Sequence, residues 1–163
     1  MSEEITSIFN KIKSIYKEYD LNLVSGGLVD SKGKSDVDIS LYCEAYNTLH
    51  HVFKNSTATT YPDEKATIYS ISGYDREVNI FATSDINRVN IAIKHRNNEL
   101  KLNKYPLLVS AAITLKRLGE STESAWMKVL ELNGDPYQIM ARDDIEDIAK
   151  IQEERLKMIM NKL

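Results

Sequence analysis

The chain has a single cysteine, no run of basic residues and no long apolar segment, and each absence excludes a class of protein. Cys43 has no second cysteine to pair with, so we expect no internal disulfide and a reducing, cytoplasmic setting. No apolar run approaches the ~18 residues that a membrane-spanning helix requires. The Met-Ser-Glu-Glu start is unlike a signal peptide, and internal repeats are lacking. These absences predict a soluble cytoplasmic protein.

The charge balance argues against a protein that coats nucleic acid. The 163 residues carry a formal net charge of −3, with ordinary globular shares of charged residues (28%) and hydrophobic residues (42%). A tight, nonspecific nucleic-acid binder needs many lysines and arginines to neutralise phosphates. We therefore expect no extended nucleic-acid surface, although a nucleotide or an RNA end could bind at a local site.

Periodicity and turn residues predict an α/β part followed by a helical part, which is an α/β (α+β) fold class. Helices are expected from Ser2 to about Lys17 and over residues 44–54. Strands are expected over these ranges: 21–25, 36–43, 57–61, 66–72 and 76–82. Further helices are expected over about 84–102, 106–118, 121–130, 136–140 and 143–163. No linker separates the parts, so the sequence predicts one domain over 1–163, divided into 1–83 and 84–163.

Two carboxylates open the second predicted strand, in the segment Ser35-Asp36-Val37-Asp38. Side chains two residues apart on a strand share a face, so Asp36 and Asp38 are expected to point the same way. Like charges this close repel each other unless a cation lies between them. Mg²⁺ suits such oxygen ligands and completes its shell with water and substrate phosphates. Asp36 and Asp38 are therefore candidate magnesium ligands; the alternative is a loop end and a solvated strand residue.

A glycine pair, Gly26-Gly27, follows the first predicted strand. Glycine lets backbone N–H groups approach a bulky anion because no Cβ is in the way. The loop that follows carries Lys32 and Lys34, whose ammonium groups could reach triphosphate oxygens, although a solvated loop is the plainer interpretation.

An apolar strand, Gly26-Gly27, Asp30 and then Asp36-Val37-Asp38 resemble the opening of the nucleotidyltransferase superfamily, which includes DNA polymerase β, CCA-adding and poly(A) polymerases and small antibiotic nucleotidyltransferases. The match is to the CCA-adding type of opening, and it covers roughly residues 20–82. The resemblance implies a mixed β-sheet with flanking helices and a C-terminal helical half. It also implies Mg²⁺ on Asp36 and Asp38, a phosphate-facing turn at Gly26 and Gly27, and Ser35 orienting the entry to the second strand.

The resemblance further implies transfer of a nucleoside monophosphate from a nucleoside triphosphate to a hydroxyl acceptor, helped by a third carboxylate on a neighbouring strand. The chain departs from this pattern, because Val78-Asn79-Ile80 has an amide where the acid is expected. Asparagine can coordinate a cation through its carbonyl oxygen, but it is no base. Glu77 shares a face with Asn79 and is the candidate substitute. An exposed Glu77 and a structural Asn79 are an equally good interpretation.

The helix expected after Thr83 carries Arg88, His95, Arg96 and Glu99. Arg88, His95 and Glu99 recur near one side and could form a polar stripe, with His95 and Arg96 binding phosphate or assisting proton transfer. A solvated helix face is the more common explanation for such a pattern.

Three functional hypotheses follow. The first is a Mg²⁺-dependent nucleotidyltransferase whose acceptor is a small molecule, a protein side chain or an RNA end. The second is a binding module that has lost turnover, such as a nucleotide sensor or a toxin-neutralising subunit. If Glu77 reaches the Asp36–Asp38 pair, catalysis is favoured; if only Asn79 does, binding is favoured. The third is a coincidental motif, which predicts both aspartates facing solvent with no concavity beside them.

Overall fold

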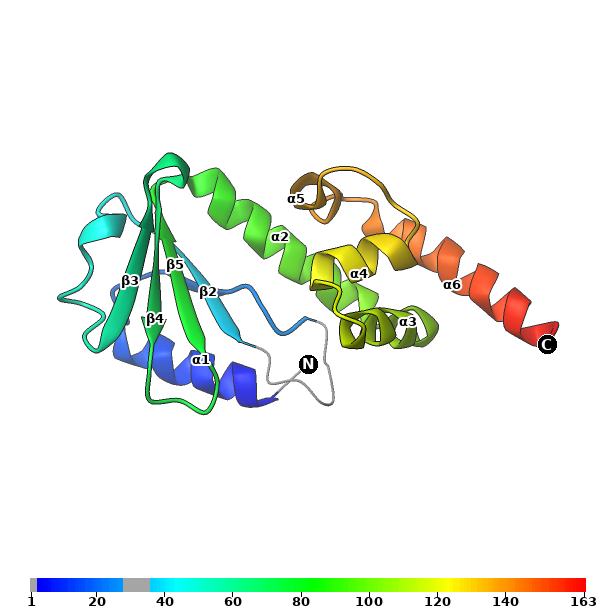
Figure 1. Cartoon of the computed structure of the whole chain (residues 1–163), viewed down its shortest axis with the longest axis horizontal. Coiled ribbons are helices and arrows are strands. Elements are labelled where there is room, and N and C mark those ends of the chain that lie inside the picture. The colour runs from blue at the N-terminus through cyan, green and yellow to red at the C-terminus, as the bar shows by residue number, and fades with distance from the viewer. Residues whose placement is uncertain (1–2, 28–35) are drawn as a thin grey trace. The chain divides into compact units, whose positions relative to one another are not determined.

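The computed structural model describes residues 3–27 and 36–163, which form an α+β fold with a mixed sheet, flanking helices and a C-terminal helical part, as predicted (Figure 1). The described residues divide into two compact units. The first comprises residues 3–26 and 36–93, and the second comprises Gly27 and residues 94–163.

The first unit is built around a five-stranded sheet with the order β1-β2-β5-β4-β3. Its strands are β1 (Leu21–Leu23), β2 (Val37–Tyr42), β3 (Ser56–Tyr61), β4 (Ala66–Ile71) and β5 (Val78–Thr83). The two central neighbours β2 and β5 run parallel, and the other neighbouring pairs run antiparallel. Each strand was predicted from alternation to within a few residues, and the mixed sheet matches the expectation.

One face of this sheet is apolar and covered by α1 (Glu3–Ile15) (Figure 1). The core on this face gathers one side of α1 and alternate residues of the central strands: Ile5, Ile8, Ile12, Val37, Ile39, Leu41, Val78, Ile80 and Ala82. Removing this much apolar surface from water is the main force that holds the unit together. The alternation that buries these residues turns Asp38 and Asn79 to the opposite face.

The helix expected over residues 44–54 is absent, which corrects the sequence-based prediction. A single 3₁₀ turn, η1 (Tyr46–Thr48), occupies this segment, and η2 (Pro62–Glu64) is a similar turn between β3 and β4. The Tyr69 hydroxyl donates to the Tyr46 carbonyl and accepts from the Leu49 N–H at 3.0 Å. A side chain of the sheet thus satisfies backbone groups that a helix would have paired internally, and tertiary contact overrides the apolar spacing.

The helix α2 (Ile86–Leu102) begins in the first unit and continues into the second. The other helices of the second unit are α3 (Pro106–Arg117), α4 (Thr122–Val129), α5 (Pro136–Ile139) and α6 (Ile145–Asn161). Ser121 and Asp135 cap two of these helices, because their side chains accept backbone N–H groups in the first turns of α4 and α5. The core of this unit surrounds Trp126, which is fully buried.

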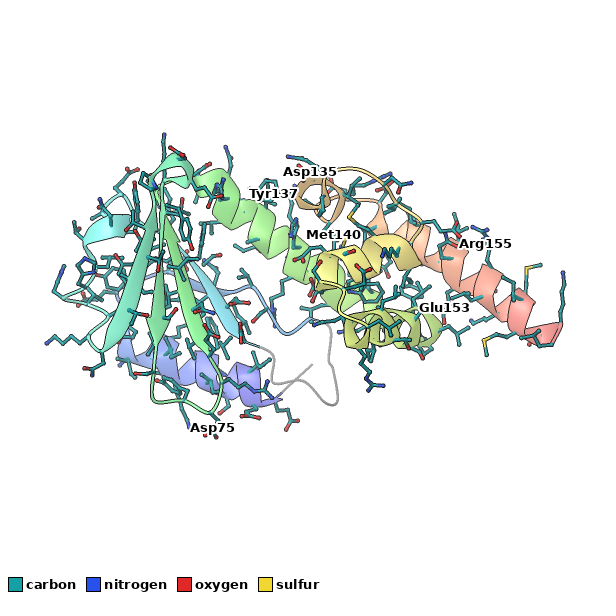
Figure 2. The ribbon with its side chains drawn as sticks, viewed as in Figure 1. Asp75, Asp135, Tyr137, Met140, Glu153 and Arg155 are labelled. Atoms are coloured by element: carbon teal, nitrogen blue, oxygen red, sulfur yellow. The ribbon has the colours of Figure 1, made fainter. Side chains whose placement is uncertain are left out.

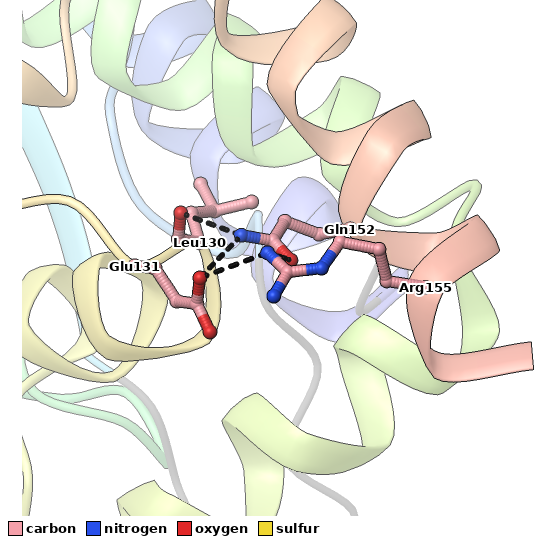
Figure 3. A network of polar contacts seen from close by, with 4 residues as sticks. All are labelled: Leu130, Glu131, Gln152 and Arg155. Carbon is pink, nitrogen blue, oxygen red and sulfur yellow. Dashed lines mark hydrogen bonds and ion pairs between the residues drawn. The ribbon is translucent and has the colours of Figure 1, made fainter. Parts of the chain in front are cut away.

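Polar contacts attach α6 to the first turn of α3 and to the end of α4. The Glu153 carboxylate, 2% exposed, accepts from the backbone N–H groups of Leu107 and Leu108 in the first turn of α3. Near the end of α4, Gln152 donates to the Leu130 carbonyl at 3.3 Å, and Arg155 donates to Glu131 at 3.0 Å (Figure 3). No helix within the described residues combines the length and the apolar character needed to cross a membrane.

Candidate functional site

A row of polar side chains crosses four neighbouring strands on the face of the sheet opposite α1. Strand register pairs Asp38 of β2 with Asn79 of β5, Asn79 with Ser70 of β4, and Ser70 with Thr57 of β3. Paired residues of neighbouring strands share a face, so these four side chains, here called the polar row, lie side by side. This arrangement joins residues up to 41 positions apart in the chain.

Hydrogen bonds connect three members of the polar row. The Ser70 hydroxyl donates to Asn79 Oδ1 at 2.7 Å, and Asn79 Nδ2 donates to Asp38 Oδ1 at 3.4 Å. The second contact is long and correspondingly weak. Asn79, predicted as a nucleotide-binding residue in the place of an acid, therefore reaches Asp38. Its carbonyl oxygen accepts from a hydroxyl, and its amide nitrogen faces the carboxylate.

The second carboxylate, Asp36, lies one step before β2, level with Glu77 at the start of β5. The Val37 N–H donates to the Glu77 carbonyl at 2.8 Å, which holds the two segments together at this level. Partial burial and, after it, the negative charge of Glu77 raise the pKa of Asp36 above its usual value. Asn79 thus contacts Asp38, and Glu77 lies level with Asp36, where its charge acts on that carboxyl.

Ser25 fixes the backbone of the Asp-x-Asp segment. Its hydroxyl donates to the Asp36 carbonyl at 2.9 Å and accepts from the Asp38 N–H at 2.8 Å. The Val24 N–H also donates to the Asp38 carbonyl at 2.8 Å. Neither Ser25 nor Ser70 belongs to a motif that predicts a role for it. Alternation along residues 66–72 could have placed Ser70 on the polar face, but no pattern shows that Ser25 binds across a loop.

Backbone conformation and close packing both favour glycine at Gly26 and Gly27, independently of any ligand. Gly26 has a positive φ of +84°, a conformation that L side chains rarely adopt. Gly27 lies against α2 in the second unit, where an added Cβ would be only 2.4 Å from Cβ of Glu99. Asn103 Nδ2 also donates to the Gly27 carbonyl. These constraints explain both glycines without a ligand. The phosphate-facing role of Gly26 and Gly27 stays a prediction.

The polar residues of α2 differ from the solvated stripe that their spacing suggests. Glu99 is 7% exposed, and burial first, then the charge of Glu123, raises its pKa to about 8. Burial lowers the pKa of Arg96, and the nearby Glu99 acts against that change. His95 Nε2 lies 2.8 Å from the Tyr137 carbonyl, so this nitrogen carries the proton in that contact. Arg88 lies 3.8 Å from Glu64 in the first unit.

Several predicted site residues cannot be placed. Asp30, Lys32, Lys34 and Ser35 lie outside the described residues. Among residues 3–27 and 36–163, no group of three or more histidine, cysteine, aspartate or glutamate side chains is arranged to hold a metal ion. The two hard carboxylates Asp36 and Asp38 remain a donor set that suits Mg²⁺, which commonly takes one or two protein carboxylates and keeps several waters.

A concavity of about 390 Å³ adjoins the polar row at the turn between β4 and β5. It is here called the turn concavity, and its lining includes Asn55, Thr57, Ser70, Ser72, Tyr74 and Glu77. The concavity therefore shares Thr57 and Ser70 with the polar row, and Glu77 of its lining lies level with Asp36.

Comparison with known proteins places the chain in one family. A family model described as "Domain of unknown function (DUF4269)" matches residues 8–142. Comparisons with curated proteins and with solved structures gave no match. The matched range contains the whole polar row, both aspartates and the turn concavity.

Proposed function

We propose that this chain, which belongs to the family described as Domain of unknown function (DUF4269), is a Mg²⁺-dependent nucleotidyltransferase that moves a nucleoside monophosphate from a nucleoside triphosphate to a hydroxyl acceptor. The observation that carries the proposal is the parallel register of β2 and β5. It sets Asp36 level with Glu77 and Asp38 level with Asn79, on the face that α1 leaves uncovered. Asp36 and Asp38 lie two residues apart on one strand face, and Mg²⁺ commonly takes one or two such carboxylates and completes its shell with water and phosphate oxygens.

The residues divide into two roles at the reaction centre in this proposal. Asp36 and Asp38 would hold Mg²⁺, which would supply neutralisation of the phosphate charge. Glu77 accepts the proton of the acceptor hydroxyl, because it is the carboxylate that lies level with Asp36 at the start of β5. The acceptor oxygen bonds to the α-phosphorus, the bond from this phosphorus to the bridging oxygen breaks, and pyrophosphate leaves with that electron pair.

The resemblance assigns nucleotide binding to further residues. Backbone N–H groups at Gly26 and Gly27 would face the phosphates, and the Asn79 amide would lie beside the metal ligands. Lys34, Ser35 and Arg96 keep the nucleotide-binding role predicted from the sequence. The negative charge of the polar face favours a nucleoside triphosphate delivered with its Mg²⁺ over a free anion.

A second candidate is a binding module without turnover, such as a nucleotide sensor or a partner-binding, antitoxin-type protein. The specific observation in its favour is Asn79, which occupies the position level with Asp38 and uses its amide to join Ser70 to that carboxylate. An uncharged amide cannot accept a proton from an acceptor hydroxyl. On this candidate the surface would bind nucleotide and release no pyrophosphate.

The test is a calorimetric titration of the four nucleoside triphosphates with Mg²⁺, followed by a pyrophosphate assay in the same samples. The wild type is compared with the double variant Asp36→Asn, Asp38→Asn and with the matched control Asp63→Asn, an exposed acid of η2 in the same unit. We expect Mg²⁺-dependent binding that is lost in the double variant and kept in the control. Binding with no pyrophosphate release would favour the second candidate, and binding that survives the double variant would overturn both.

A further inference from the structure

We propose that the exposed edge of β3 pairs antiparallel with the β3 edge of a second copy of this chain, so that two five-stranded sheets join into one. The pairing needs neither nucleotide nor Mg²⁺ and does not depend on the proposed reaction. Three features of β3 carry it: its outer edge is open, it lacks the features that usually protect an edge, and its two ends carry opposite charges.

The outer edge of β3 is open along the whole strand. β3 is the last strand in the sheet order, and within the described residues its backbone pairs with β4 alone (Figure 1). In an antiparallel ladder every second residue directs its N–H and C=O away from the neighbouring strand, so alternate backbone groups of β3 point outward. Residues 57–61 are all exposed, including Ala58 and Thr60 on the face that α1 covers over the central strands. This strand is therefore accessible from its edge and from both faces.

The usual protection of an edge strand is missing from β3. Edges are normally blunted by shortness, by lysine or proline within the strand, or by a bulge. β3 has six residues, Ser-Thr-Ala-Thr-Thr-Tyr, with no charge and no proline, and its ladder with β4 is continuous. The opposite edge of the sheet is β1, with only three residues. Pairing through β3 alone would therefore close after two copies instead of continuing into a fibre.

The charges at the two ends of β3 favour a second copy as the added strand. Lys54 precedes the strand and Asp63 follows it, and both side chains are exposed. Two-fold symmetry in an antiparallel pair brings the start of one strand beside the end of the other, so Lys54 of each copy would lie beside Asp63 of the other copy. Glu64 is directed to Arg88 at 3.8 Å, so Asp63 is the acid that we assign to Lys54.

The other charges near the Lys54 end belong to the turn between β4 and β5, which lies further inward in the sheet. Asp75 is the exposed acid of this turn (Figure 2), and Arg76 is directed to Glu4 of α1 at 3.2 Å. Both strands that the turn joins lie inside β3 in the sheet order. These charges therefore do not stand on the edge that would be paired.

The pairing would place two polar rows on one face of the joined sheet. Residues directly opposite each other in an antiparallel pair point to the same side, so equivalent faces of the two copies coincide. Thr57, the last member of the polar row, belongs to β3. The polar rows of the two copies would therefore approach each other across the new strand pair.

Sedimentation equilibrium of the full chain, from about 10 µM to about 1 mM, measures this association. An interface made mainly by one strand pair is smaller than the standard protein interface, so we expect a dimer with a Kd on the order of 100 µM and no larger species. Thr59→Lys sets two lysines close together at the centre of the strand pair and should weaken the dimer at least about tenfold. Thr59→Val keeps a β-branched side chain at this exposed position and is the matched control, which should associate as the wild type does.

Two charge-swapped variants distinguish pairing through this edge from any other dimer. Lys54→Glu and Asp63→Lys each set like charges beside each other at both ends of their own dimer, so each alone should associate about fivefold more weakly at low salt. An equal mixture of the two variants sets opposite charges beside each other at both ends. We expect this mixture to recover wild-type association through the mixed dimer.

Backbone amide exchange followed by NMR locates the contact. The outward N–H groups of β3 should exchange more slowly at about 1 mM than at about 50 µM, because pairing with a second strand protects them. A chain that stays monomeric at about 1 mM would overturn the proposal and leave this edge to a strand of another protein. A dimer that Thr59→Lys leaves intact, or a mixture that associates no more tightly than the separate variants, would also overturn it and move the contact elsewhere.

Discussion

Asn79 and Asp38 face each other at one level of two parallel strands, and the Asn79 amide donates to the carboxylate at 3.4 Å. The amide donates a hydrogen bond to the negative charge of Asp38, whereas a second carboxylate at this position would repel that charge. At Asn79 the chain departs from the three-acid pattern that its Asp36-Val37-Asp38 segment resembles, because an amide stands where the third acid is expected.

Replacing Asn79 with aspartate should make stability depend on magnesium. Without Mg²⁺, Asn79→Asp sets two carboxylates directly opposite each other and removes the amide donor, so we expect a loss of about 1 kcal/mol in the free energy of unfolding. With Mg²⁺ the loss should shrink or reverse. Thermal melting in chelator and in Mg²⁺ measures this, with Ser70→Ala as a control that disturbs the same contacts without charge. A Mg²⁺ response equal to that of the wild type would contradict a cation site here.

Glu99 should make the second unit less stable as the pH rises. Its pKa of about 8 in the folded chain lies above the ordinary 4.5, so between these values the folded state keeps a proton that the unfolded state releases. The free energy of unfolding must then fall with rising pH, by up to about 1.4 kcal/mol per pH unit. Glu99→Gln imitates the protonated form and should remove this pH dependence. Its free energy of unfolding should therefore exceed that of the wild type by a margin that grows between pH 4.5 and about 8.

Urea unfolding at several pH values, followed by the fluorescence of Trp126, measures the free energy of unfolding. Trp126 is the single tryptophan and lies in the second unit, as Glu99 does. The exposed acid Glu154 of α6 supplies the control variant Glu154→Gln. A stability difference between Glu99→Gln and the wild type that stays constant with pH would show that Glu99 ionises normally.

Glu153 should be the most costly acid of the second unit to remove. Its buried carboxylate accepts from two backbone N–H groups at the start of α3, at 3.0 and 3.1 Å. Glu153→Ala leaves both donors buried and unpaired, so we expect a loss of roughly 2–4 kcal/mol in the free energy of unfolding. Glu153→Gln keeps a carbonyl acceptor and should lose about half as much. The Trp126 signal reports this change, and equal losses in the two variants would show that packing outweighs the hydrogen bonds.

Tyr69 should stabilise the segment where a helix was wrongly predicted. Tyr69→Phe leaves the Tyr46 carbonyl and the Leu49 N–H without their hydroxyl partner, at a cost of about 1–3 kcal/mol. Tyr42→Phe is the control, because the Tyr42 hydroxyl contacts only Glu44 on an exposed surface. Thermal melting followed by circular dichroism compares the two. A loss no larger than that of Tyr42→Phe would mean that apolar packing alone shapes the segment.

The predictions that the structure confirms came from patterns among residues close together in the sequence. Alternation in β2 and β5 put Val37 and Val78 in the core, and with them turned Asp38 and Asn79 outward. The caps Ser121 and Asp135 marked where α4 and α5 begin. Such signals concern residues within a few positions of one another, which is the range over which the sequence can be interpreted without a structure.

What the sequence by itself determined was the set of elements apart from the helix expected over residues 44–54, together with the Asp36-Val37-Asp38 segment and the amide in place of a third acid. What only the tertiary structure decided was which residues meet across strands: Asn79 with Asp38, Glu77 with Asp36, and Ser25 with the backbone of both aspartates. Tertiary structure also buried Glu99, which its helical spacing placed on a polar stripe. The physical reason is that register, burial and long-range hydrogen bonds depend on how distant segments pack, and no local pattern contains that information.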